Sequence, residues 1–149
     1  LMNFQVAQIK DLIQVMKANN RKVIIHLELI KGISNDEFGA IYLIQEHKVD
    51  GIITTKPRVI DLCKKRNVIG IMRFFLKDTV SLKQSVELVK RVGPDSLEVL
   101  PAMPESLNLL KGLIACPIYM GGLIQNQAHI DACLKEGAKG ITVSNESLW

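Results

Sequence analysis

The sequence predicts a parallel α/β barrel of the TIM-barrel type, a (β/α)8 fold whose first βα unit is missing from this chain. Short apolar runs alternate with amphipathic helical patterns along all 149 residues. The runs are almost continuously apolar, which is typical of strands buried on both faces of a parallel sheet. The segment Gln5-Val6-Ala7-Gln8 after the first run lacks the glycines of a dinucleotide fingerprint, which disfavours an open doubly wound sheet.

Seven strands and six helices are predicted, in strict alternation. The strands are short runs rich in β-branched residues at 1–4, 22–27, 51–54, 68–72, 96–100, 117–120 and 140–143. The helices have apolar residues at spacings of three and four, at 9–19, 36–47, 59–66, 80–92, 105–113 and 128–136. Prolines at helix starts and glycines at helix ends agree with these bounds: Pro57, Pro104, Gly93 and Gly137.

The number of strands sets the expected domain organisation. Seven strands are one short of a closed barrel, and the sequence starts at Leu1 rather than at an initiator Met. We therefore expect residues 1–149 to form a single barrel domain that is truncated at its N-terminus. No long linker or low-complexity segment interrupts it.

The composition excludes some classes of protein. With 48% hydrophobic and 23% charged residues, the chain is an ordinary globular protein. No apolar run has the length of a bilayer span and no signal segment begins the sequence, so no membrane association is expected. Cys63, Cys116 and Cys133 share no metal or redox spacing and suit a reducing cytoplasm. The net charge of +4 is compatible with an anionic ligand or a nucleic acid.

Two late segments indicate a phosphate site. Gly121-Gly122 follows one predicted strand and Ser144-Asn145 follows the next. In parallel barrels the loops after the last two strands often bind phosphate, because glycines let backbone N–H groups approach the anion and a helix N-terminus adds partial positive charge. The sequence therefore predicts a phosphorylated small-molecule ligand.

Polar side chains at the other strand ends complete the predicted site. His26, Glu28, Thr54, Arg73 and Glu98 lie in or directly after predicted strands. Because the carboxyl ends of barrel strands share one rim, we expect these residues to converge with the two late loops.

Several of these residues also have structural interpretations. His26 in an apolar strand is typical of a hydrogen-bonded core histidine. Glu98 faces opposite to its apolar neighbours and needs a partner such as Arg73 or Lys56. Whether Glu98 forms a structural ion pair or accepts hydrogen bonds from ligand hydroxyls stays open. Arg73 has the planar fork that suits a phosphate.

Basic residues gather at three predicted helix ends, just before strands. They are typical of cations that complement the helix dipole on a solvated face, and the alternative is an RNA-binding patch on the amino-terminal face of the barrel. Only 5% of residues are aromatic, which disfavours a base-stacking platform. The residues are Arg21, Lys22, Lys64, Lys65, Arg66, Lys90 and Arg91.

Taken together, the motifs resemble one known family, the glycerol-3-phosphate-responsive antiterminators, also called glycerol uptake operon antiterminator regulators. The segments that resemble it are residues 26–37, 50–55, 71–76, 98–101, 121–124 and 144–149. The resemblance implies a bacterial cytoplasmic regulator with a TIM-barrel-like fold that senses glycerol 3-phosphate. It further implies action on the leader mRNA of a glycerol-utilisation operon, so that transcription passes a terminator.

The resemblance also implies which residues contact the ligand. They are His26, Thr54, Arg73, Glu98, Gly121, Gly122, Ser144 and Asn145. Glu28, Met72 and Ala102 depart from the aspartate, glutamine and glycine common in the family. The longer carboxylate of Glu28 could narrow the pocket, and Met72 removes a possible hydroxyl contact.

Two other functions stay open beside the regulator. A TIM-barrel enzyme, such as an aldolase, isomerase or synthase, could act on a small phosphorylated substrate, with acid–base groups among Glu98, Glu28, His26 and Lys56. No lysine is placed within a strand for a Schiff base and no metal-ligand cluster appears, so we expect no catalytic residue, cofactor or metal. A plain interaction scaffold is the weaker alternative. The oligomeric state, including a homo-oligomer, stays open.

Overall fold

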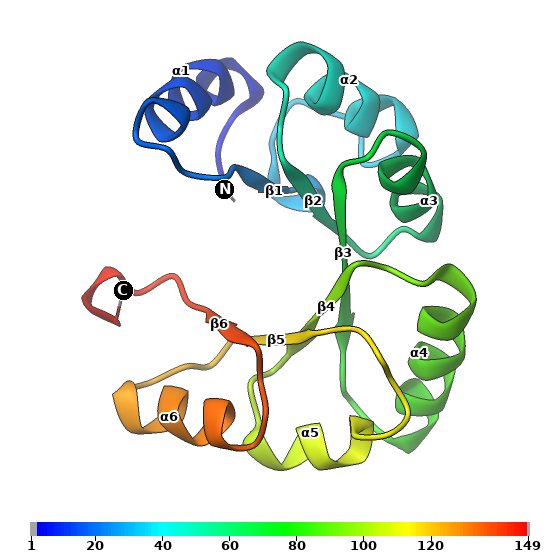
Figure 1. Cartoon of the computed structure of the whole chain (residues 1–149). Helices are drawn as coiled ribbons and strands as arrows, with labels where there is room; N and C mark the ends of the chain where they lie inside the picture. The colour runs from blue at the N-terminus through cyan, green and yellow to red at the C-terminus, as the bar shows by residue number, and fades with distance from the viewer. Residues whose placement is uncertain (1–2, 149) are drawn as a thin grey trace. The chain divides into compact units, whose positions relative to one another are not determined.

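The computed structural model describes residues 3–148 and divides into two compact units. Unit 1 is Leu1–Met72 and unit 2 is Arg73–Trp149. In each unit, helices and parallel strands alternate along the chain, as the sequence predicts (Figure 1).

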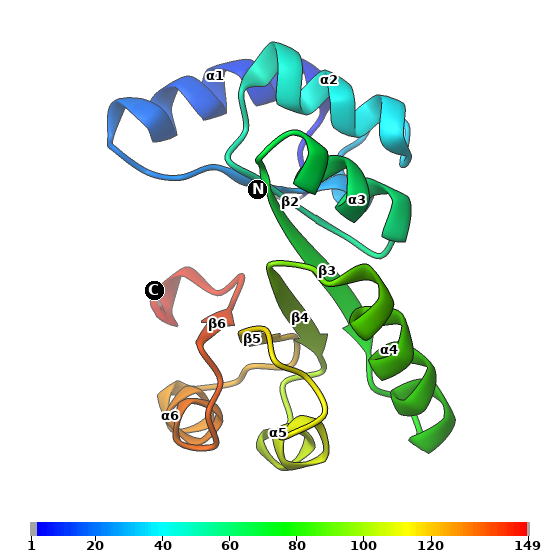
Figure 2. The ribbon, with the colours of Figure 1, turned by 45° about the vertical axis from the view of Figure 1, so that its right-hand side comes forward.

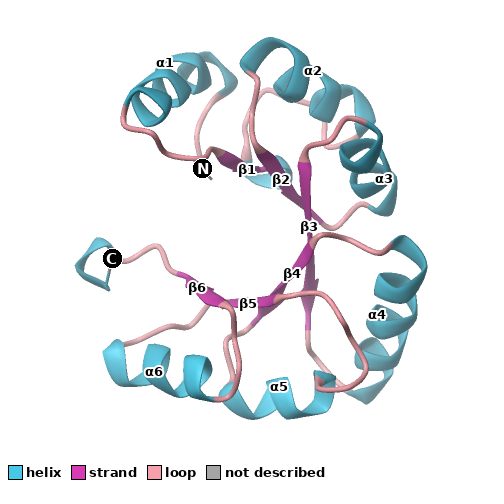
Figure 3. Ribbon diagram, viewed as in Figure 1, coloured by secondary structure: helices cyan, strands magenta, loops and turns pink. Residues whose placement is uncertain are grey.

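The described residues of unit 1 form three parallel strands, three α-helices and one 3-10 helix; Figure 3 colours helices and strands apart. Ile24 lies opposite Gly51 and Gly51 lies opposite Ile69, so the strand order is β1–β2–β3. The last three residues of β3 belong to unit 2. The elements are α1 (Val6–Ala18), β1 (Ile24–His26), η1 (Leu27–Leu29), α2 (Glu37–His47), β2 (Gly51–Thr54), α3 (Pro57–Lys65) and β3 (Ile69–Phe75).

The core of unit 1 lies between its strands and its helices. Ile25 of β1 and Ile52 of β2 are completely buried in one apolar cluster with Ile9 of α1, Leu43 of α2 and Val59 of α3. The helices α1, α2 and α3 lie on one side of these strands in both ribbon views (Figures 1 and 2). Burial of such side chains contributes about 1.5–3 kcal/mol each relative to exposure.

The N-terminal segment differs from the prediction. Leu1 and Met2 of the predicted strand 1–4 lie outside the described residues, and α1 already begins at Val6. The short stretch before the helix forms a single parallel bridge, Gln5 with Lys31, rather than a strand. Two bonds join Lys31 to this stretch, from its own N–H to the Phe4 carbonyl and from the Val6 N–H to the Lys31 carbonyl, both 2.9 Å long.

Unit 2 repeats the alternation. Leu97 lies opposite Ile118 and Tyr119 opposite Gly140, so its parallel strands have the order β4–β5–β6. Met120 of β5, Leu107 of α5 and Cys133 of α6 are buried in one cluster. The elements are α4 (Thr79–Val92), β4 (Ser96–Leu100), α5 (Pro104–Leu110), β5 (Ile118–Gly121), α6 (Gln127–Lys135), β6 (Gly140–Thr142) and the 3-10 helix η2 (Glu146–Leu148).

The ends of β1 and β3 differ from the prediction, which changes the place of two predicted ligand residues. The strand predicted at 68–72 continues to Phe75, so Arg73 lies within β3 and not after it. Glu28 lies in η1 and not in a strand, because the chain leaves the extended conformation after His26. Within residues 3–148, no helix is long and apolar enough to cross a membrane.

Candidate functional site

The predicted ligand residues fall into two groups, one in each unit. Unit 1 contains His26, Glu28 and Thr54, which lie at the carboxyl ends of β1 and β2. Unit 2 contains Arg73, Glu98, Gly121, Gly122, Ser144 and Asn145. That both groups belong to one rim stays a prediction.

A buried ion pair is the centre of the unit 2 group. Glu98 on β4 is 3% exposed, and its Oε2 accepts a hydrogen bond of 2.6 Å from Nε of Arg73. Its Oε1 accepts a second bond of 2.8 Å from the Thr142 hydroxyl on β6. The prediction that Arg73 or Lys56 pairs with Glu98 is thus resolved in favour of Arg73. Nε of Arg73 makes this bond, and the guanidinium has two further nitrogens that carry N–H donors.

Gly121 makes the contact between Thr142 and Glu98 sterically possible. Gly121 is the register partner of Thr142, so both residues face the same side of the sheet. A Cβ at Gly121 would lie only 2.1 Å from Oγ1 of Thr142. Side chains of β4 and β6 therefore meet above β5 because residue 121 has no side chain. This steric reason for glycine is independent of any ligand.

The two late turns lie side by side, as the sequence predicts. They follow Gly121 and Thr142, which are paired across β5 and β6. At Gly122 the chain turns with φ +76°, in the left-handed region that favours glycine. Ser144 and Asn145 are exposed, and Oδ1 of Asn145 accepts bonds from the backbone and hydroxyl of Ser147 at the start of η2. A short helix after the last barrel strands is a frequent part of phosphate sites.

The turn after β4 is hydrogen-bonded to the turn after β5. The Ala102 N–H, just after β4, donates to the Gly122 carbonyl at 3.1 Å. Nε2 of His129 on α6 donates a hydrogen bond of 2.6 Å to the Ala102 carbonyl. Sequence reasoning missed His129 and Thr142, because their roles depend on register and on tertiary contacts that no local pattern shows.

The unit 1 group is organised around the Glu28 carboxylate. Its Oε1 accepts hydrogen bonds from the Thr54 hydroxyl (2.7 Å), the Thr55 backbone (2.7 Å) and the Thr55 hydroxyl (2.9 Å). Its Oε2 lies 3.5 Å from Nδ1 of His26, which is buried. Burial raises the pKa of the Glu28 carboxyl, but the bonds from Thr55 and Thr54 outweigh it and hold the pKa below the usual 4.5. The structure thus brings His26, Glu28 and Thr54 together, and adds Thr55.

The match to a protein family decides what this chain is. The sequence profile described as "Glycerol-3-phosphate responsive antiterminator" matches residues 1–149. The chain belongs to this family. The resemblance expected from the sequence motifs is thereby confirmed.

Two solved structures with names from this family are similar over nearly the whole chain. The glycerol uptake operon antiterminator regulatory protein from Listeria monocytogenes is 32% identical, with a TM-score of 0.93 over 99% of this chain and 80% of that chain. The glycerol uptake operon antiterminator-related protein from Thermotoga maritima is 24% identical, with a TM-score of 0.87 over 100% of this chain and 85% of that chain.

More distant structures show the fold class. The orotidine 5'-phosphate decarboxylase from Pyrococcus horikoshii, a TIM-barrel enzyme, is 12% identical, with a TM-score of 0.67 over 95% of this chain and 76% of that chain. The predicted TIM-barrel-like α/β fold class is therefore confirmed. At this identity the likeness is one of fold and not of chemistry.

The basic residues predicted to bind RNA in this family member are all exposed. They belong to both units. Lys90 of unit 2 lies 3.9 Å from Glu87 in an exposed ion pair of one helix turn. The residues in unit 1 are Arg21, Lys22, Lys64, Lys65 and Arg66.

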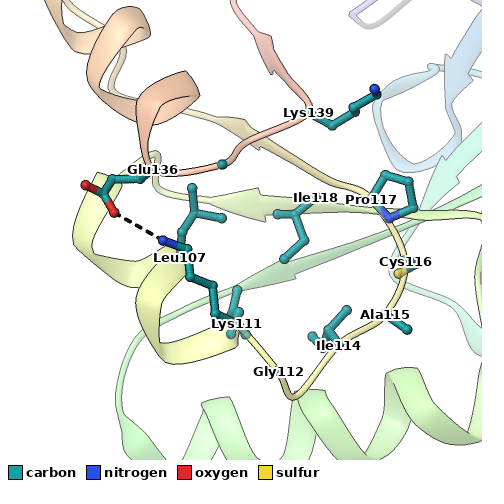
Figure 4. Close-up of a pocket in the computed structure, with 12 residues that line it drawn as sticks. Leu107, Lys111, Gly112, Ile114, Ala115, Cys116, Pro117, Ile118, Glu136 and Lys139 are labelled. Carbon is teal, nitrogen blue, oxygen red and sulfur yellow. Dashed lines mark hydrogen bonds and ion pairs between the residues drawn. The ribbon is translucent and has the colours of Figure 1, made fainter.

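A cavity of unit 2 lies away from the predicted ligand residues. It has a volume of about 420 Å³ and opens at the amino-terminal end of β5, between the ends of α5 and α6 (Figure 4). An ion pair between Lys111 and Glu136, 3.4 Å long, lines one side. Burial and the nearby Asp95 raise the pKa of the Cys116 thiol, so it stays protonated at neutral pH. Among residues 3–148, no three His, Cys, Asp or Glu residues form a group that could hold a metal.

The steric role of Gly121 leads to a prediction on stability. We expect Gly121→Ala to lower the free energy of unfolding by about 2–3 kcal/mol, because the new Cβ displaces Thr142 and breaks its bond to Glu98. In a Thr142→Ala background the same change should cost less than about 1 kcal/mol. Chemical denaturation of the four proteins of this cycle measures the coupling. Additive costs would show that Gly121 and Thr142 do not interact in this way.

The Glu28 contacts lead to a prediction on pH. We expect Glu28→Gln to cost about 1–3 kcal/mol of stability at pH 7, because an amide cannot accept all the hydrogen bonds that the carboxylate accepts. The folded pKa is lowered, so the carboxylate stabilises the fold above the unfolded carboxyl pKa of about 4.3 and loses this effect as the pH falls through the folded pKa. The difference between wild type and variant should therefore shrink from pH 6 to pH 3. A difference that is constant over this range would contradict the assignment.

Proposed function

We propose that this protein senses glycerol 3-phosphate and acts on the leader mRNA of a glycerol-utilisation operon, allowing transcription past a terminator. Membership of the antiterminator family and the printed name of the Listeria monocytogenes protein support the regulatory part. The observation that supports ligand sensing most directly is the pair of adjacent turns after β5 and β6, next to the Arg73–Glu98–Thr142 network.

The phosphate is proposed to bind at the two late turns of unit 2. Gly122 is half-buried and Ser144 is exposed, and both lie just after the carboxyl ends of neighbouring strands, where parallel α/β folds bind anions. The guanidinium of Arg73 adds a positive charge that Glu98 orients. His26, Glu28 and Thr54 of unit 1 stay proposed ligand contacts, with Glu28 as an acceptor for hydroxyl groups.

The charges of the two carboxylates favour binding over acid–base catalysis. A general acid or base works best when its pKa lies near the working pH. Glu28 accepts three hydrogen bonds that hold its pKa low, and Glu98 is paired with Arg73. Glu28 is therefore ionised at neutral pH, and both carboxylates are already bonded to fixed donors. We propose on this basis that the protein is a regulator and not an enzyme.

A sensor must also bind its ligand unequally in two states. Glycerol 3-phosphate can change the action on RNA only if it favours one conformation or one oligomeric form over another. Such a regulator would work in the cytoplasm, which suits Cys63, Cys116 and Cys133, none of them in a disulfide within the described residues.

Calorimetric titration tests the phosphate site. We expect glycerol 3-phosphate to bind and glycerol to bind at least tenfold more weakly. Ser144→Asp should reduce the affinity for glycerol 3-phosphate at least tenfold, because a carboxylate in the exposed turn repels the dianion. The matched control is Asn108→Asp, which makes the same charge change at an exposed position of α5 and should alter the affinity less than twofold.

Two results would contradict the proposal. One is the absence of both heat and thermal stabilisation with millimolar glycerol 3-phosphate. The other is turnover of a triose or pentose phosphate that Glu98→Gln abolishes, which would assign the site to an enzyme.

A further inference from the structure

The net positive charge of this protein belongs to unit 1. Residues 1–72 contain eleven Lys and Arg against seven Asp and Glu, a formal net charge of +4. Residues 73–149 contain eight of each and are formally neutral. The whole net charge of +4 therefore belongs to one of two units of similar length. Charges that serve only to keep a protein soluble would be spread over both units, so the surplus in unit 1 needs another explanation.

Within unit 1, the topology gathers the cations at one edge. Adjacent parallel strands lie about 4.8 Å apart, so the amino-terminal ends of β1, β2 and β3 stand in a row. Basic residues precede each of these ends. Arg21 and Lys22 precede β1, Lys48 precedes β2, and the run 64–66 at the end of α3 precedes β3 (Figure 3). We call these residues, together with Lys17, the basic edge.

Local contacts hold the basic edge together. Lys48 ends α2 in the left-handed conformation, and its carbonyl accepts a hydrogen bond from Nζ of Lys17, which draws α1 toward the end of α2. Asp50 is one acidic residue near this edge, and its Oδ2 accepts a 2.7 Å hydrogen bond from the Val23 N–H at the start of β1. Lys17, Arg21, Lys22, Lys48, Lys65 and Arg66 are exposed.

The helix dipole explains only part of this pattern. Cations in the last turn of a helix contribute about 0.3–1 kcal/mol each, and α3 and α4 both end with them. In unit 2, however, acidic residues balance the basic ones. Lys90 lies near Glu87, and Lys111 is paired with Glu136. The dipole therefore accounts for the basic pairs in both units but not for the surplus in unit 1.

We propose that the basic edge of unit 1 is the surface that contacts the phosphate backbone of RNA. This inference rests on the proposed function, since it assigns a place to the RNA partner of an antiterminator. It removes Lys90 and Arg91 from the residues expected from the sequence and adds Lys17 and Lys48. A row of lysines and arginines meets phosphates without reading bases, so this edge supplies affinity and orientation rather than sequence specificity.

The test compares two triple variants that remove equal charge. Lys22→Gln/Lys65→Gln/Arg66→Gln alters the basic edge, and Lys83→Gln/Lys90→Gln/Arg91→Gln alters α4 of unit 2. Each set includes two residues at a helix end, so both lose similar dipole interactions. Binding to a transcript of a glycerol-operon leader is measured by gel shift at several salt concentrations. Calorimetry with glycerol 3-phosphate and thermal melting monitor the ligand site and the fold.

We expect the variant of the basic edge to bind the transcript at least tenfold more weakly, and the variant of α4 to stay within twofold of wild type. The slope of log K against log salt should become shallower by about 2 in the first variant, because each lost phosphate contact on a single strand changes it by about 0.7. Both variants should bind glycerol 3-phosphate as wild type does.

Three results would overturn the inference. The variant of the basic edge could bind RNA with unchanged affinity and slope, or both variants could lose equal affinity. In the third result, wild-type protein binds glycerol 3-phosphate but no RNA. The basic edge then binds an acidic surface of RNA polymerase instead. Failure to bind glycerol 3-phosphate while the RNA results hold would overturn the proposed ligand and leave the surface supported.

Discussion

A carboxylate buried in a sheet must be compensated, and in this protein the compensation of Glu98 organises unit 2. Removing one partner of a buried ion pair costs about 3–5 kcal/mol, so Arg73, Glu98 and Thr142 constrain one another. Their contacts join β3, β4 and β6 above a glycine of β5. The two late turns begin directly after this network, so their mutual placement depends on it.

Unit 1 also contains a partly buried carboxylate, that of Glu28, but it is stabilised by a different set of donors. Glu28 is stabilised by hydroxyl and backbone donors of Thr54 and Thr55. Both carboxylates are consequently bonded to fixed donors and preorganised. Such groups suit recognition of hydroxyls or cations better than proton transfer. The likeness to TIM-barrel enzymes is one of fold and does not carry their chemistry to this chain.

The sequence was most informative where one local pattern dominated. The strands 51–54 and 96–100 are predicted to the residue, because turn or loop residues flank both short, β-rich runs. Arg73 interrupts the apolar pattern of β3, so the strand was predicted too short. The ion pair of Glu98 followed from its burial. The roles of Thr142 and His129 did not, because they depend on strand register and on contacts between distant turns.

A crystal structure of the complex with glycerol 3-phosphate is the decisive measurement for the proposed phosphate site. We expect the phosphate to accept hydrogen bonds from backbone N–H groups of residues 122–123 and 144–145, with the Arg73–Glu98 pair intact. A phosphate bound instead at the basic edge of unit 1, or in the cavity that Lys111 and Glu136 line, would contradict it.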